Sequence, residues 1–135
     1  MWEGLNISHI IMIVLIMETF IGLKYREEYV DIIQIKNLIK KDINEAIETK
    51  VLPHMKLSIT TQRFSGGVSL TIIMKSVPFH VFEMRENGSG DLTLEAQKVQ
   101  KKLEEIANAY RKSEYDVISD YYSTNFFVHV EYFNP

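Results

Sequence analysis

The residue types that most often carry chemistry are scarce in this chain. It contains no cysteine, which excludes thiol nucleophiles, disulfides and cysteine-ligated zinc. No two of its four histidines stand at the spacing of a helical metal site: His9, His54, His80 and His129. We therefore expect no metal, no cofactor and no catalytic residue. The least favoured alternative is a small enzyme or ligand pocket, with His80 or His129 beside Asp116.

One glycine turn, Ser65-Gly66-Gly67, has a composition that also occurs in oxyanion-binding loops. No GxSxG nucleophile elbow, phosphate-binding loop or calcium loop accompanies it in the sequence. The turn stands between two segments of alternating polarity, where glycine is needed for a tight connection. We interpret Arg63, Ser65, Gly66 and Gly67 as contacts for a partner.

The charge of the whole chain does not favour nucleic acid as a partner. Fifteen Lys and Arg stand against eighteen Asp and Glu, for a formal charge of −3. Basic residues nevertheless gather toward the second predicted helix, where glutamates are interleaved with them as on a solvated helix face. The alternative function is therefore a nucleic-acid-binding accessory domain, with phosphate contacts by Lys98, Lys102 and Arg111.

The most unusual segment spans residues 115–125, where three tyrosines and two aspartates fall within eight positions. One interpretation is a helix-to-strand connection whose rings cap the core. The other is an exposed recognition loop, because tyrosine gives large contact area at small entropic cost. In that second case, Asp116, Asp120, Tyr121 and Tyr122 are the expected partner contacts.

Hydrophobic periodicity predicts the elements that position these residues. Residues 31–48 have helical period with Asp31 as the N-cap, and a second helix follows Thr93. Residues 55–64 and 68–75 alternate with period two and form a predicted β-hairpin. The remaining predictions are a short strand within 79–84, a loop at 87–91, an irregular stretch at 113–125 and a strand at 126–133.

The N-terminus carries an apolar octet, residues 10–17, that is too short to span a membrane. Its β-branched residues favour a strand over residues 5–17, buried in the core or in a self-association interface that would make a homodimer. An alternative takes Met17 as the first residue. We expect no membrane partner and a cytoplasmic location in a host cell.

These elements predict one α+β domain over residues 1–135, with residues 1–28 as an apolar N-terminal extension that can add a strand. The expected architecture is an antiparallel β-sheet with two amphipathic helices packed on one face. If the N-terminal strand joins that sheet, the order becomes βαββαβ, which permits a ferredoxin-like arrangement.

Part of the chain resembles a known family. The features are Ile39-Lys40-Lys41 in the first helix, Arg63-Phe64-Ser65-Gly66-Gly67-Val68 at the hairpin, and Ser119-Asp120-Tyr121-Tyr122 before an aromatic strand. Together they resemble the large polyvalent protein-associated domain family numbered 29, over about two-thirds of the chain.

The resemblance implies an origin in phages, prophages or conjugative elements, whose proteins of this kind accompany the invading genome or counter host defence. It transfers no catalytic motif. By analogy, a free-standing acidic copy suits a counter-defence protein of the anti-CRISPR kind. We therefore expect a non-enzymatic module that binds a host effector protein or a protein–nucleic-acid complex.

Overall fold

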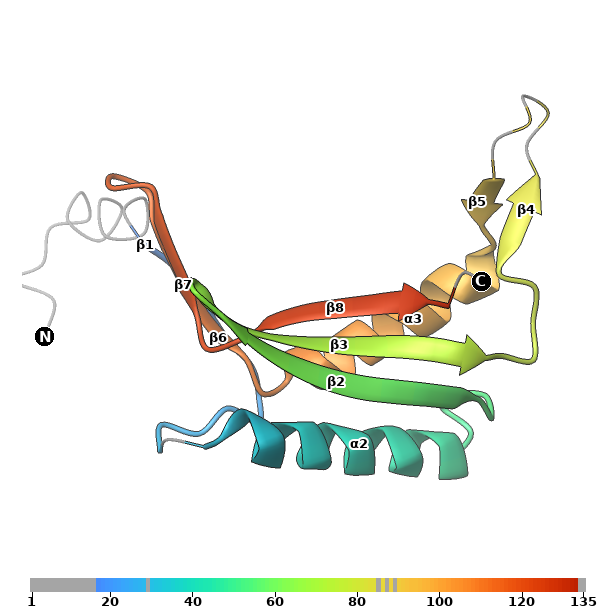
Figure 1. Cartoon of the computed structure of the whole chain (residues 1–135), viewed down its shortest axis with the longest axis horizontal. Coiled ribbons are helices and arrows are strands. Elements are labelled where there is room, and N and C mark those ends of the chain that lie inside the picture. Colours follow the sequence, from blue (N-terminus) through green and yellow to red (C-terminus); the bar gives the residue numbers. More distant parts are fainter. Residues whose placement is uncertain (1–16, 29, 85, 87, 89, 134–135) are drawn as a thin grey trace, which may run out of the picture.

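The computed structural model describes residues 17–28, 30–84, 86, 88 and 90–133, and it has an α+β fold (Figure 1). Its elements, in chain order, are β1 (Met17–Ile21), α2 (Ile32–Glu48), β2 (Lys56–Phe64), β3 (Gly67–Ser76), β4 (Phe82–Met84), β5 (Gly90–Leu92), α3 (Leu94–Asn108), β6 (Lys112–Asp116), β7 (Tyr121–Thr124) and β8 (Phe127–Tyr132).

The predicted hairpin is confirmed as β2 and β3, which pair antiparallel from Lys56 to the turn. Phe64 lies opposite Gly67, so Ser65 and Gly66 form the connection. Gly67 has a positive φ of 151°, a conformation that favours glycine. The tight turn therefore explains why glycine stands there.

The hairpin's sheet is mixed rather than purely antiparallel, because the last strand, β8, runs parallel to β3. We call β2-β3-β8 the packed sheet. A parallel pair needs a long crossover connection, and α3 lies within the one between β3 and β8. This topology corrects the expectation of an all-antiparallel sheet.

Both helices have the predicted caps and bury the predicted stripes. The Asp31 carboxylate accepts from the Ile33 N–H at 3.2 Å, and the Thr93 hydroxyl oxygen accepts from the Ala96 N–H at 3.1 Å. One core joins both helices to one face of the packed sheet. Its fully buried members include Ile39, Ile43, Leu70, Ile72, Leu103 and Phe126.

The irregular stretch predicted at residues 113–125 is instead a β-hairpin, so that prediction was wrong. β6 and β7 pair antiparallel, and β1 pairs antiparallel with β6 on its other side. We call β1-β6-β7 the projecting sheet, since it extends away from the helices beyond the hairpin turn (Figure 1). Among the described residues, β1 joins this second sheet and not the packed sheet, so the described strands do not form the ferredoxin-like arrangement.

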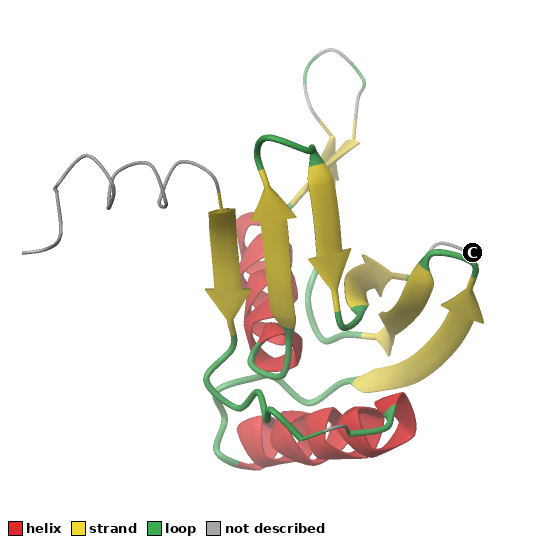
Figure 2. Ribbon diagram, turned by 90° about the vertical axis from the view of Figure 1, so that its left-hand side faces the viewer, coloured by secondary structure: helices red, strands yellow, loops and turns green. Residues whose placement is uncertain are grey.

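A two-stranded ribbon of β4 and β5 completes the described fold. The predicted strand within 79–84 is present but short, and the last two residues of the predicted loop, 90 and 91, belong to strand β5. In both views, this ribbon and the projecting sheet rise to the same side of the molecule (Figures 1 and 2). They stand at opposite ends of the packed sheet in Figure 1.

The strand and homodimer interface predicted at residues 5–17 lie outside the described residues, apart from Met17. A strand does form within the N-terminal extension, but it starts at the last residue of the apolar octet. Neither helix in the described part of the chain is long and apolar enough to cross a bilayer.

Candidate functional site

The two segments predicted to contact a partner meet where the two sheets join. Phe64, at the end of the β2–β3 hairpin, has its ring centroid 5.9 Å from that of Phe127. Tyr122, on β7, has its ring centroid 6.2 Å from the same Phe127 ring. Phe127 pairs with Ser69 and so lies on the face of the packed sheet opposite the buried Leu70. The rings therefore gather on the sheet face that the helices leave open.

Arg111 extends this set of rings across the projecting sheet. Its Nη1 donates to the Tyr122 hydroxyl oxygen at 2.8 Å, and its guanidinium carbon lies 4.9 Å from the centroid of the Phe20 ring. Phe20, Arg111, Tyr122, Phe127 and Phe64 thus form one continuous surface, which we call the aromatic strip. Phe20, Tyr122 and Phe64 remain 43%, 44% and 47% exposed. These rings are not part of the core, so the core-capping interpretation does not describe Tyr122.

The hydrogen bonds of Tyr122 fix its ring within the strip. Burial raises the pKa of the Tyr122 hydroxyl. The hydrogen bond with Ser113 and the nearby Arg111 charge together lower this pKa by more than burial raises it, so it lies below the usual value for tyrosine. The oxygen is therefore held as an acceptor of the guanidinium. The ring is oriented before any partner arrives, which reduces the entropic cost of binding.

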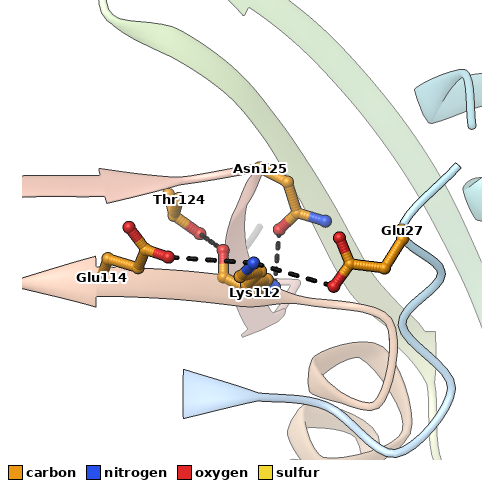
Figure 3. Close-up of polar contacts among 5 residues, drawn as sticks. All are labelled: Glu27, Lys112, Glu114, Thr124 and Asn125. Atoms are coloured by element: carbon orange, nitrogen blue, oxygen red, sulfur yellow. Dashed lines mark hydrogen bonds and ion pairs between the residues drawn. The ribbon is translucent and has the colours of Figure 1, made fainter. Parts of the chain in front are cut away.

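Asn125 connects the two sheets through its side-chain hydrogen bonds, at the point where the chain passes from β7 to β8. Its Oδ1 accepts from the N–H groups of Lys112 at 2.9 Å and Phe126 at 3.1 Å, and its Nδ2 donates to the Tyr110 carbonyl at 3.1 Å. Figure 3 shows it beside Thr124, whose hydroxyl donates to the Lys112 carbonyl at 3.3 Å. Sequence reasoning missed Asn125, although an asparagine before an aromatic strand is a typical signal of a chain reversal.

The Lys112 side chain occupies the same corner. Its Nζ lies 3.8 Å from a carboxylate oxygen of Glu114 and 4.0 Å from one of Glu27 (Figure 3). It also lies 5.5 Å from the centroid of the Tyr25 ring. These contacts connect β6 to the segment that precedes α2, and they help to fix the base of the projecting sheet.

The predicted contacts Asp116 and Asp120 shape the turn between β6 and β7. Asp116 Oδ1 accepts from the backbone N–H of Ile118 at 3.1 Å and of Ser119 at 3.5 Å. Asp120 has a positive φ of 55° and accepts a short hydrogen bond from the Tyr115 hydroxyl. That bond raises the pKa of Tyr115 above its usual value. Tyr121 follows the turn and is 66% exposed.

Arg63 is separated from the other predicted contacts. It pairs with Val68, which packs on the core, and its Nη2 lies 3.4 Å from Asp31 Oδ1 at the start of α2. Ser65 and Gly66 are exposed beside Phe64, while Gly67 lies beneath the strip. A methyl group on Gly67 would lie 3.4 Å from the Phe127 ring and 3.8 Å from the Phe64 ring.

The three residues of the nucleic-acid alternative do not come together as predicted. Lys98 is exposed on α3, and Lys102 on the same helix forms an ion pair with Glu105 at 3.7 Å. Arg111 follows the end of α3 and is bound to Tyr122 and Phe20. The structure therefore groups Arg111 with the aromatic strip and not with the two lysines.

A pocket of about 330 Å³ lies on the opposite side of the hairpin end from the strip, against α2. Its walls come from the segment before α2, from α2 and from the neighbouring chain: Lys24, Tyr25, Arg26, Glu27, Glu28, Val30, Ile32, Ile35, Leu38, Arg63, Val68, Tyr110 and Asn125. The pocket does not include His80, His129 or Asp116, so the grouping suggested for a small-ligand site is not formed there. Among the side chains that the structure describes, no group of three could hold a metal ion.

Comparison of the chain with protein-family models, with curated proteins and with solved structures finds no match. The contacts around Phe127 are therefore the strongest basis for a functional proposal. What they offer is a fixed, partly exposed surface of aromatic rings and one guanidinium. Tyr, Phe and Arg are the residue types enriched at protein interfaces.

Proposed function

We propose that the chain is a small non-enzymatic protein-binding module of phage or mobile-element origin. In this proposal it acts in counter-defence, in the manner of an anti-CRISPR protein, by occupying a surface of a host effector protein. The aromatic strip makes the central contact. The proposed origin and role are supported by the family resemblance of the hairpin end and of β7, the two segments that supply Phe64 and Tyr122.

The single observation that carries the binding proposal is the contact of Phe127 with both Phe64 and Tyr122. Three different strands each contribute one ring to the same surface, and β2 lies far from β7 and β8 in the sequence. None of these three rings is buried, although each could gain free energy by leaving water. Covering them with a partner would supply that gain, and the fixed Tyr122–Arg111 hydrogen bond would become buried without losing its partner.

The chemistry of the strip favours a protein surface over nucleic acid. A nucleic-acid site needs several cations free to contact phosphates, and the only cation of the strip, Arg111, already bonds Asn108 and Tyr122. The packed sheet's open face is lined mainly by Ser, Thr and Gln side chains next to the strip. A hydrophobic centre with a polar rim is the usual composition of a protein interface.

Affinity capture from a host lysate, followed by mass spectrometry and by titration of the purified partner, tests the proposal. We expect the wild-type chain to retain a protein, and the double variant Phe64→Ala with Tyr122→Ala to bind it at least about 100-fold more weakly. Phe82→Ala is the matched control, because Phe82 is a 56% exposed aromatic residue on β4, away from the strip. Phe82→Ala should bind with wild-type affinity.

Melting curves show whether the double variant remains folded. Because both rings are more than two-fifths exposed, we expect the melting temperature to fall by only a few degrees. Equal binding by the double variant and the wild type would overturn the proposed site. Retention of nucleic acid in place of protein, with a steep salt dependence, would support the alternative that uses Lys98 and Lys102.

A further inference from the structure

The charges of the chain are divided between two parts of the fold. All fifteen Lys and Arg residues lie between Lys24 and Lys112, together with twelve of the eighteen carboxylates. The two flanking segments contain no Lys or Arg, and they carry the other six carboxylates: Glu3, Glu18, Glu114, Asp116, Asp120 and Glu131. The overall charge of −3 is therefore +3 in the middle of the chain and −6 at its two ends.

The projecting sheet is built mostly from these cation-free ends. β1, β7 and all of β6 after Lys112 lie within them. Glu18 pairs with Tyr115 across β1 and β6, and Asp116 pairs with Tyr121 across β6 and β7. Three carboxylates, Glu18, Asp116 and Asp120, therefore gather toward the free end of the sheet, away from Arg111 and Lys112 at its base.

The turn at this free end exposes large apolar side chains. Val117 is 44% exposed, Ile118 76% and Tyr121 66%. We call residues 116–121 the hairpin tip. Single exposed apolar residues are common on protein surfaces, but a cluster of three on one turn is typical of an interaction site.

The tip is also fixed in shape. The Asp116 carboxylate accepts from two backbone N–H groups of the turn, and Asp120 accepts from the Tyr115 hydroxyl. A turn held in this way loses little entropy when it is bound. It therefore presents Ile118 in one orientation between two carboxylates.

We infer that the hairpin tip inserts into an apolar recess of the partner protein whose rim carries Lys and Arg. This inference rests on the proposed function and names the chemistry of the partner's surface. Apolar contact by Val117, Ile118 and Tyr121 gives affinity, and the uniform negative charge around them selects a basic rim and speeds association. A host protein surface that normally binds nucleic acid has this basic character, so the tip would compete with nucleic acid there.

Three synthetic peptides of twelve residues serve as defined probes of this chemistry, with binding followed by fluorescence anisotropy. One alternates Arg with Leu, one alternates Arg with Ser, and one alternates Glu with Leu. We expect the Arg/Leu peptide to bind best, the Arg/Ser peptide about tenfold more weakly, and the Glu/Leu peptide not measurably. Amide shifts in the NMR spectrum should locate the bound peptide at residues 116–121.

The decisive variant removes charge but keeps the turn: Glu18→Gln, Asp116→Asn and Asp120→Asn. Asparagine retains the accepting Oδ1 at both turn positions and tolerates the positive φ of residue 120. We expect it to bind the Arg/Leu peptide at least about tenfold more weakly. The matched control, Glu45→Gln, Glu48→Gln and Glu83→Gln, changes the net charge equally at exposed positions elsewhere and should bind normally.

The same two triple variants are then tested against the captured partner. The inference is supported if the tip variant fails to capture the partner and if added duplex DNA releases the partner from the wild-type chain. If Phe64→Ala with Tyr122→Ala abolishes capture while the tip variant retains it, the proposed function stands and this inference is wrong. If no protein is captured at all, the proposed function fails, and the order in which the three peptides bind decides the inference by itself.

A last outcome concerns self-association. If the wild-type chain self-associates and the tip variant does not, the hairpin tip binds a second copy of this chain, and the inference of a separate partner protein is wrong.

Discussion

The packed sheet and the projecting sheet use their side chains in opposite ways. Strands β2, β3 and β8 bury one face against two helices, and this core contains the fully buried aliphatic side chains that the structure describes, apart from Ala96. Among the side chains whose burial the structure describes, strands β1, β6 and β7 contribute no buried hydrophobic residue, and the single buried side chain is Ser113. One sheet therefore stabilises the domain, and the other leaves its rings partly exposed.

This difference indicates how the projecting sheet persists without a core of its own. A small sheet without a packed face is marginally stable in isolation. Here it is attached at its base, where Gly22 N–H donates to the Arg111 carbonyl at 2.8 Å and Lys24 N–H donates to the Ala109 carbonyl at 2.7 Å. Its order depends on a few backbone and Asn125 contacts, so substitutions at the base should affect the two sheets differently.

The largest expected effect comes from the residue between the two sheets. Phe126 is fully buried in the core immediately before β8. Phe126→Ala should lower the free energy of unfolding by about 4 kcal/mol, through lost burial and the cavity left behind. Tyr121→Ala, on the projecting sheet, should change it by less than about 0.5 kcal/mol. Urea unfolding curves measure both, and similar losses would contradict the division between the sheets.

The second prediction detaches the projecting sheet. A Cβ atom on Gly22 would lie 2.3 Å from the Asn108 carbonyl oxygen and 2.4 Å from that of Ala109, so the backbone must move apart. We expect Gly22→Ala to cost about 3 kcal/mol by overpacking. Hydrogen exchange should accelerate in β1 and β6 far more than in β3. Uniform acceleration would mean that the two sheets unfold as one unit.

Much of the packed half could be predicted from sequence, because its signals are local. The Ile32–Ile43 spacing, the Asp31 and Thr93 caps and the Gly67 turn each act within a few residues. The parallel pairing of β8 with β3 was not predicted, although α3 lies within the long crossover that a parallel pair needs. Nothing local, however, indicates which strand β8 selects.

The projecting half escaped prediction because its strands lack an alternating apolar face. Tyr115, Tyr121 and Tyr122 are good strand residues, but the aspartates and serine between them are typical of loops. β6 becomes a strand through pairing with β1, which lies far away in the sequence. Tyr122 and Phe127 flank the Asn125 turn, but Phe64 and Phe20 come from distant segments, so only the three-dimensional structure brings the strip together.

Asn125 allows a test of how firmly the two sheets are held relative to each other. Asn125→Ala removes three hydrogen bonds, to Lys112, Phe126 and Tyr110, and should cost about 2 kcal/mol. We expect weaker partner binding as well, because Tyr122 and Phe127 would no longer share one orientation. Asn44→Ala is the control, because Asn44 is exposed on α2, away from the strip. Equal partner binding by both variants would show that the strip is held by the rings alone.

The smallest expected effect is on the pH dependence of stability, and it differs between two tyrosines, one on each sheet. Burial of Tyr132, on the packed sheet, raises its pKa to about 12, and its hydroxyl donates to the Ala96 carbonyl at 2.7 Å. Tyrosine in an unfolded chain ionises near pH ~10. The contribution of Tyr132 to stability is therefore complete below pH ~10 and is lost as the pH rises toward 12.

The pKa of Tyr122, on the projecting sheet, is shifted in the opposite direction to that of Tyr132. Its folded-state pKa lies below the usual value, so its contribution to stability is gained as the pH rises through that pKa toward ~10. In an ultraviolet titration, Tyr122→Phe should remove an early ionisation step and Tyr132→Phe a late one. At neutral pH, Tyr132→Phe should cost only about 1 kcal/mol for its hydrogen bond. If the two hydroxyls ionise at the same pH, the two rings share one environment. That result would contradict the difference between the exposed strip and the packed core.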